Sequence, residues 1–75
     1  MSDIKLTKAQ RAFLEAIADP LTPDHEREAH VDYSPTNALH VKGLVDRRAV
    51  SMYRGRYTIT PAGRAWLAAN PRRNK

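Results

Sequence analysis

Two short runs of alternating apolar and polar residues predict a β-hairpin in the second half of the chain. They cover residues 50–53 and 56–59, with Arg54-Gly55 between them. A glycine readily supplies the positive φ that a two-residue hairpin turn needs, so we place the turn at Arg54-Gly55. This register puts four residues on the apolar face of the hairpin: Val50, Met52, Tyr57 and Ile59. The opposite face carries Ser51, Tyr53, Arg56 and Thr58. An irregular loop is the alternative.

Start and stop signals predict four helices around this hairpin. The first begins after Thr7, which has the capping-box spacing to Gln10, and ends at Asp19, which precedes a proline. The second covers residues 23–30, with Thr22 as its cap. Because this second segment is acidic and has little apolar surface, packing against the rest of the domain has to hold it.

The third helix is expected over residues 35–42, with Ser34 as its cap and Gly43 as its stop. Leu39 is the centre of its buried face, and Thr36 lies at the border of that face. Four residues point away from the core: Ser34, Asn37, His40 and Val41.

The fourth helix is expected to begin after the cap Thr60 and to end at Asn70. Its apolar residues share one stripe: Ala62, Ala65, Trp66 and Ala69. Leu44 and Val45, which precede the hairpin, are expected in the core.

The length of 75 residues allows one domain with one core, which we place at residues 1–70, followed by a flexible basic tail at residues 71–75. The sequence contains no cysteine, which excludes disulfides and is typical of a reducing compartment. It has no apolar run of signal-peptide or membrane-spanning length. We therefore expect a cytoplasmic location.

The net charge of +5 is unevenly distributed along the chain. Residues 1–32 hold four Lys and Arg against seven Asp and Glu, whereas residues 33–75 hold nine against one. A basic surface confined to one part of a domain is typical of a protein with a polyanionic partner. A solvated, solubilising surface is the alternative.

Signals of catalysis are missing from the sequence. His25, His30 and His40 do not form the i, i+4 pair of a helical zinc site, and no cysteine can complete one. The three glycines are isolated, so no phosphate-binding loop is present. We expect neither an enzyme nor a cofactor.

Two stretches of the chain resemble the MarR and PadR type of bacterial regulator. Leu39 followed by residues 42–47 (KGLVDR) looks like the end of that family's recognition helix, and residues 57–64 (YTITPAGR) look like its second wing strand and the following helix. The resemblance implies a winged helix-turn-helix: a mainly α fold with a three-helix core, a two-stranded wing and a C-terminal helix. The long terminal dimerisation helices of such proteins have no counterpart here, so we expect a monomer or a weak homodimer.

The resemblance further implies that the third helix enters the major groove of duplex DNA and that the wing contacts the backbone or the minor groove. Asn37 is the first candidate for base recognition, because an amide pairs bidentately with adenine; helping to cap the helix is its alternative role. Lys42, Arg47 and Arg48 are suited to phosphates. Arg54 and Arg56 flank the expected hairpin tip, on the same side of the molecule as the third helix. Ser34, Thr36, His40 and Tyr53 complete the predicted set.

We therefore expect a DNA-binding transcriptional regulator or architectural protein of bacterial or phage origin, associated with the nucleoid. The alternative is a winged-helix interaction module that binds an acidic protein, such as a polymerase subunit or a host factor. RNA is a weaker candidate, because a single exposed tyrosine is a poor stacking platform.

Overall fold

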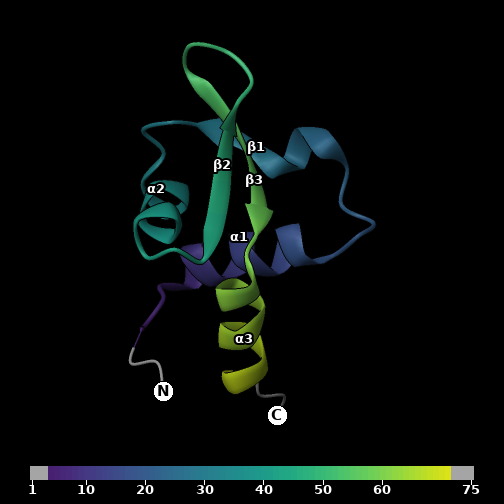
Figure 1. The fold of residues 1–75 in the computed structure, drawn as a ribbon, viewed down its shortest axis with the longest axis vertical. Helices are drawn as coiled ribbons and strands as arrows, with labels where there is room; N and C mark the ends of the chain where they lie inside the picture. Colours follow the sequence, from purple (N-terminus) through teal and green to yellow (C-terminus); the bar gives the residue numbers. More distant parts are fainter. Residues whose placement is uncertain (1–3, 72–75) are drawn as a thin grey trace.

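A three-stranded antiparallel sheet, with strand order β1-β3-β2, forms the centre of this small mixed α/β domain (Figure 1). The computed structural model describes residues 4–71, so the expected basic tail lies, except for Pro71, outside the described residues. The elements follow in the order α1 (Lys8–Ala18), the 3-10 turn η1 (Asp24–Arg27), β1 (Glu28–His30), α2 (Ser34–Val41), β2 (Val45–Ala49), β3 (Arg54–Ile59) and α3 (Pro61–Ala69).

Helix α1 has the expected boundaries. The Thr7 hydroxyl accepts a hydrogen bond from the Gln10 amide (3.2 Å), and the Gln10 side chain accepts one from the Thr7 amide (3.0 Å), which completes the predicted capping box. At the other end, the Arg27 guanidinium donates to the carbonyl oxygens of Ile17 and Asp19. A cation is well placed there, because it meets the negative end of the helix dipole.

The predicted second helix over residues 23–30 is wrong. Only η1 is helical, and the chain then continues as β1, which pairs with β3. This segment has little apolar surface for a helical stripe, whereas pairing with β3 satisfies its backbone and buries Ala29 opposite Gly55. Because of this third strand, the fold is mixed α/β and not mainly α.

The predicted turn at Arg54-Gly55 is also wrong. Both residues belong to β3, Ala49 pairs with Gly55, and residues 50–53 form the connecting loop. A Cβ at Gly55 would lie 2.6 Å from Cγ of Arg47, so the glycine leaves room for the Arg47 stem and does not make a turn. Tyr57 is completely buried, as expected, but Val50 and Met52 are exposed.

The link from α2 to the sheet follows the prediction more closely. Leu39 is buried, Gly43 has a φ of +78°, and Leu44 and Val45 lie in the core. Ser34 is the first residue of α2 and does not cap it.

Helix α3 begins at the predicted cap. Thr60 accepts a hydrogen bond from the Gly63 amide (3.0 Å) through its hydroxyl, which also donates to the Gly43 carbonyl (2.8 Å). Trp66 is buried, and its indole N–H donates to the Ile4 carbonyl (2.8 Å). The alanines expected beside Trp66 on a buried stripe, Ala62, Ala65 and Ala69, are exposed.

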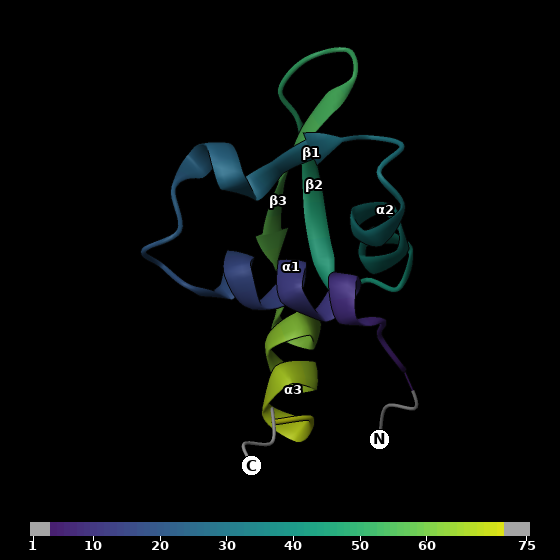
Figure 2. The ribbon, with the colours of Figure 1, turned by 180° about the vertical axis from the view of Figure 1, so that it is seen from behind.

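The domain is elongated, with extents of 39 × 25 × 20 Å. Helix α3 lies at one end of the long axis and the β2–β3 loop at the other, and α1 crosses between them (Figures 1 and 2). The core joins the three α-helices to the sheet and consists of Leu14, Ile17, Ala29, Leu39, Leu44, Val45, Tyr57 and Trp66. Within the described residues, no helix combines the length and apolarity needed to cross a membrane.

The close approach of α3 to the start of β2 predicts the sign of one substitution. A Cβ at Gly63 would lie 2.2 Å from the Leu44 carbonyl oxygen, a backbone atom that cannot move aside easily. Gly63→Ala should therefore lower the free energy of unfolding by about 1–3 kcal/mol. Helix propensity alone would raise it by about 1 kcal/mol. Urea unfolding measures the difference.

Gly55→Ala is the matched control. The nearest atoms to its new methyl group belong to the flexible Arg47 side chain, so the loss of stability should be smaller than for Gly63→Ala. A Gly63→Ala variant more stable than the wild type would show that α3 does not pack this closely.

Candidate nucleic-acid interface

Strand pairing divides the predicted DNA-binding residues between two sides of the sheet. Residues paired across antiparallel strands share a side, and successive residues alternate. Arg47 pairs with the buried Tyr57 and therefore lies on the side that carries the helices. Arg48 pairs with Arg56, and Arg54 with His30, on the opposite side, which we call the outer side.

The exposed ridge of α2 is polar along most of its length. Ser34 and Asn37 are exposed, Val41 continues the ridge, and His40 is half-buried at its flank. These orientations are the predicted ones, since Leu39 faces the core from the opposite side of the helix.

Two cations border this ridge, where the chain leaves α2 and enters the sheet. Lys42 directly follows α2, and Arg47 projects from β2 on the same side of the sheet as the helix. Neither has an ion-pair partner within residues 4–71, and the sequence from residue 33 to residue 45 contains no acid. Asp46 pairs with Thr58 on the outer side. We call this set the α2 face: Ser34, Asn37, His40, Lys42 and Arg47.

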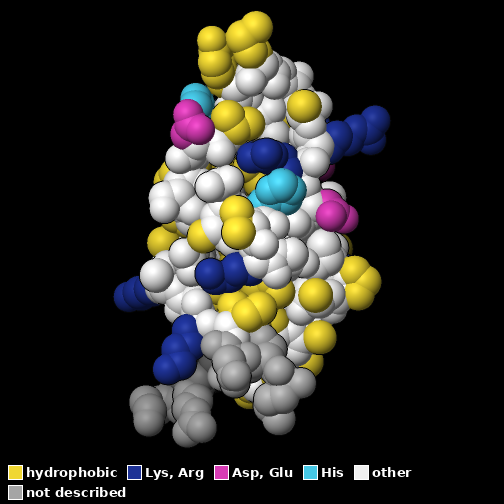
Figure 3. All heavy atoms as spheres, turned by 60° about the vertical axis from the view of Figure 1, so that its left-hand side comes forward, with side chains coloured by type: hydrophobic (Ala, Val, Ile, Leu, Met, Phe, Trp, Pro, Cys, Tyr) yellow, Lys and Arg dark blue, Asp and Glu magenta, His cyan; other side chains and the backbone are white. Residues whose placement is uncertain are grey.

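Figure 3 looks toward the side of the molecule that carries α2 and β2. Lys and Arg side chains are spaced along it, a histidine lies between two of them, and acidic side chains are found at its margins. The hydrophobic side chains at the upper end mark the β2–β3 loop.

Thr36 is not available for the predicted contact with DNA. Its side chain is completely buried, and its hydroxyl donates to the Tyr33 carbonyl (2.9 Å). A residue at the border of a helical stripe is buried or exposed according to the tilt of the helix, which the sequence does not specify.

Arg54 and Arg56 do not project from the same side as α2, contrary to the prediction. Both guanidinium groups lie on the outer side beside the Glu28 carboxylate, at N–O distances of 3.8 Å and 3.0 Å. The Glu28 side chain is only 18% exposed, so its charge is held between the two arginines. One carboxylate therefore offsets part of the positive charge that we had assigned to the wing.

The two remaining candidates, Arg48 and Tyr53, lie on different parts of the sheet and its loop. Arg48 is exposed on the outer side, next to Arg56 across the strands. Tyr53 belongs to the β2–β3 loop, where its ring stacks on that of His30 at a centroid distance of 5.9 Å and an interplanar angle of 8°. Tyr53 is therefore held in place by β1, an element that the sequence did not reveal.

The part that Glu28 plays could not be predicted from the sequence. Glu28 is one of several acids in the same segment, and nothing in the sequence distinguishes it from Asp24 or Glu26. Only the pairing of Glu28 with Arg56 across β1 and β3 singles it out.

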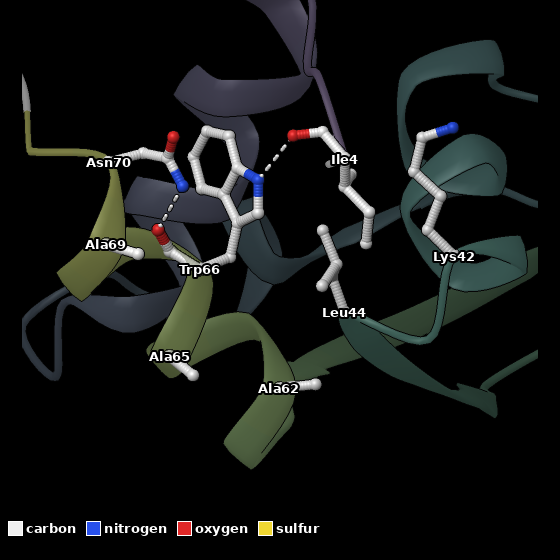
Figure 4. Close-up of a pocket in the computed structure, with 8 residues that line it drawn as sticks. All are labelled: Ile4, Lys42, Leu44, Ala62, Ala65, Trp66, Ala69 and Asn70. Carbon is white, nitrogen blue, oxygen red and sulfur yellow. Dashed lines mark hydrogen bonds between the residues drawn. The ribbon is translucent and has the colours of Figure 1, made fainter. Parts of the chain in front are cut away.

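A groove of about 600 Å³ lies beside α3 (Figure 4). Its walls are mostly apolar, with the Lys42 ammonium at one side and the Asn70 amide at the other. Its lining residues include no Asp, Glu, His, Cys, Ser, Thr or Tyr. Within residues 4–71, no three or more His, Cys, Asp or Glu side chains are grouped so as to hold a metal ion.

Comparisons with known proteins add no relative to this picture: no family model, curated protein or solved structure matches the chain.

Proposed function

We propose that this protein binds double-stranded DNA through the α2 face, as a transcriptional regulator or architectural protein. The observation that carries the proposal is the charge of that face: Lys42 and Arg47 are unpaired within the described residues, and the α2 segment beside them is free of acids. Cations without nearby carboxylates are what a phosphate backbone requires.

The dimensions of α2 suit the major groove. An α-helix with its side chains is about 10–12 Å across, and the major groove is about 12 Å wide, so the exposed ridge of α2 can enter it. The exposed Asn37 amide would pair with adenine, and the exposed Val41 would contact a thymine methyl group. Lys42 and Arg47 would hold phosphates on either side and fix the position of the helix.

The winged helix-turn-helix is part of this proposal. The strand order β1-β3-β2 and the position of the β2–β3 hairpin between α2 and α3 support it. The fold departs from the expected pattern before α2, where η1 and β1 replace the second helix, and in the side of the sheet that carries Arg54 and Arg56. The resemblance to MarR and PadR regulators rests on the two stretches of sequence quoted above.

Removing the cations of the α2 face should weaken binding to every duplex alike. For Lys42→Ala and Arg47→Ala, the log–log slope of affinity against salt should become shallower by about 0.9 per lost phosphate contact. Fluorescence anisotropy with random duplex DNA between low and moderate salt measures the slope. Arg54→Ala on the outer side and Arg64→Ala on α3 are the matched controls, and neither should change it.

A change of slope in the controls with none in Lys42→Ala or Arg47→Ala would place the interface elsewhere. Absence of duplex binding at low salt, together with binding to an acidic protein, would favour the alternative function as an interaction module.

Asn37→Ala should act on sequence preference and not on the salt slope. Loss of a bidentate contact reduces discrimination by about 1–3 kcal/mol at one base pair. Binding to a randomised duplex library, compared between Asn37→Ala and the wild type, measures the preference; Ser34→Ala is the neighbouring control. An unchanged preference in Asn37→Ala would exclude this side chain from base recognition.

A further inference from the structure

The tip of the hairpin is apolar. The loop that joins β2 to β3 consists of Val50, Ser51, Met52 and Tyr53, and the Met52 side chain is 80% exposed. Val50 and Tyr53 are also exposed, so three large apolar side chains meet solvent at one end of the long axis (Figure 3). Exposed apolar groups gathered in this way mark an interaction site more often than single ones do.

The loop is held firmly at its base. The amides of Val50 and Ser51 both donate to the Arg54 carbonyl, at 3.0 Å and 3.2 Å, and the Val31 amide donates to the Tyr53 carbonyl at 2.8 Å. The stack of Tyr53 on His30 fixes the side chain next to Met52. Met52 is therefore presented at the end of an ordered support, which lowers the entropy cost of inserting it into a partner.

We infer that Met52 is a wedge that enters the minor groove of bound duplex DNA and partly unstacks one base step. This inference rests on the proposed function. Apolar side chains, methionine among them, open base steps in this way and kink the duplex by roughly 20–90°.

The size of the tip favours DNA over a protein partner. A stable protein interface needs roughly 20–30 residues on each side, whereas the apolar tip has three large side chains in a loop of four residues. A narrow projection of this kind matches a groove or a gap between bases. The preferred site of insertion can also be predicted. Pyrimidine–purine steps such as TA unstack most easily, so Met52 should insert there.

The experiment compares bending and unstacking in the wild type, Met52→Ala and Leu21→Ala. Leu21 is 87% exposed in the loop after α1 and controls for loss of any exposed apolar side chain. Duplexes carry either a donor and acceptor pair at their ends, to report the bend by energy transfer, or 2-aminopurine at a central TA step, to report unstacking.

The wild type and Leu21→Ala should bend the duplex and raise 2-aminopurine fluorescence, while Met52→Ala should still bind with an unchanged salt slope but lose most of both signals. The preference for TA steps should disappear in Met52→Ala alone.

Four results would overturn the wedge. Wild-type binding without bending or unstacking would remove it while leaving DNA binding intact, as would bending by Met52→Ala equal to that of the wild type. Failure of the wild type to bind duplex DNA at low salt would remove both the wedge and the proposed function. Met52-dependent binding to lipid vesicles, without DNA bending, would assign the tip to a membrane surface instead.

Discussion

The structure depends on one junction where the two halves of the chain meet. Gly43 leaves α2 in a left-handed conformation, and its carbonyl accepts a hydrogen bond from the Thr60 hydroxyl. The Leu44 carbonyl accepts one from the Thr60 amide and lies where a Cβ of residue 63 would have to be. Four elements, α2, β2, β3 and α3, are thereby joined within a few residues. A domain of this size has a small core, so such backbone contacts determine how the helices sit on the sheet.

The junction and the strand register together determine which side chains can act jointly. The junction holds α2 beside β2, and the register turns Arg47 toward the helix and Arg48 away from it. The α2 face and the apolar tip of the hairpin are therefore linked through one strand. This strand, β2, runs from the junction directly into the loop that carries Met52. On the outer side, Glu28 lies between Arg54 and Arg56, so these two arginines are less available to a phosphate than Lys42 and Arg47.

Several features that depend on a few neighbouring residues could be predicted from the sequence, although the caps expected at Thr22 and Ser34 are not formed. The capping box at Thr7, the stop at Gly43, the cap at Thr60 and the burial of Leu39 all follow from local chemistry, and the structure confirms them. Features that depend on a distant strand could not. Gly55 has the local preferences of a turn, but β1 and the Arg47 stem make it a strand residue. The same distant pairing moved Arg54 and Arg56 to the outer side, and the tilt of α2 buried Thr36.

On the proposed function, α2, the start of β2 and the hairpin tip form a single surface for duplex DNA. An amide NMR titration with random duplex DNA at low and at high salt tests it most directly. We expect salt-sensitive shifts for the amides of residues 34–42 and 47–53, with those of α3 and η1 unchanged. Shifts confined to α3 or to the outer side of the sheet, or no shifts at low salt, would contradict it.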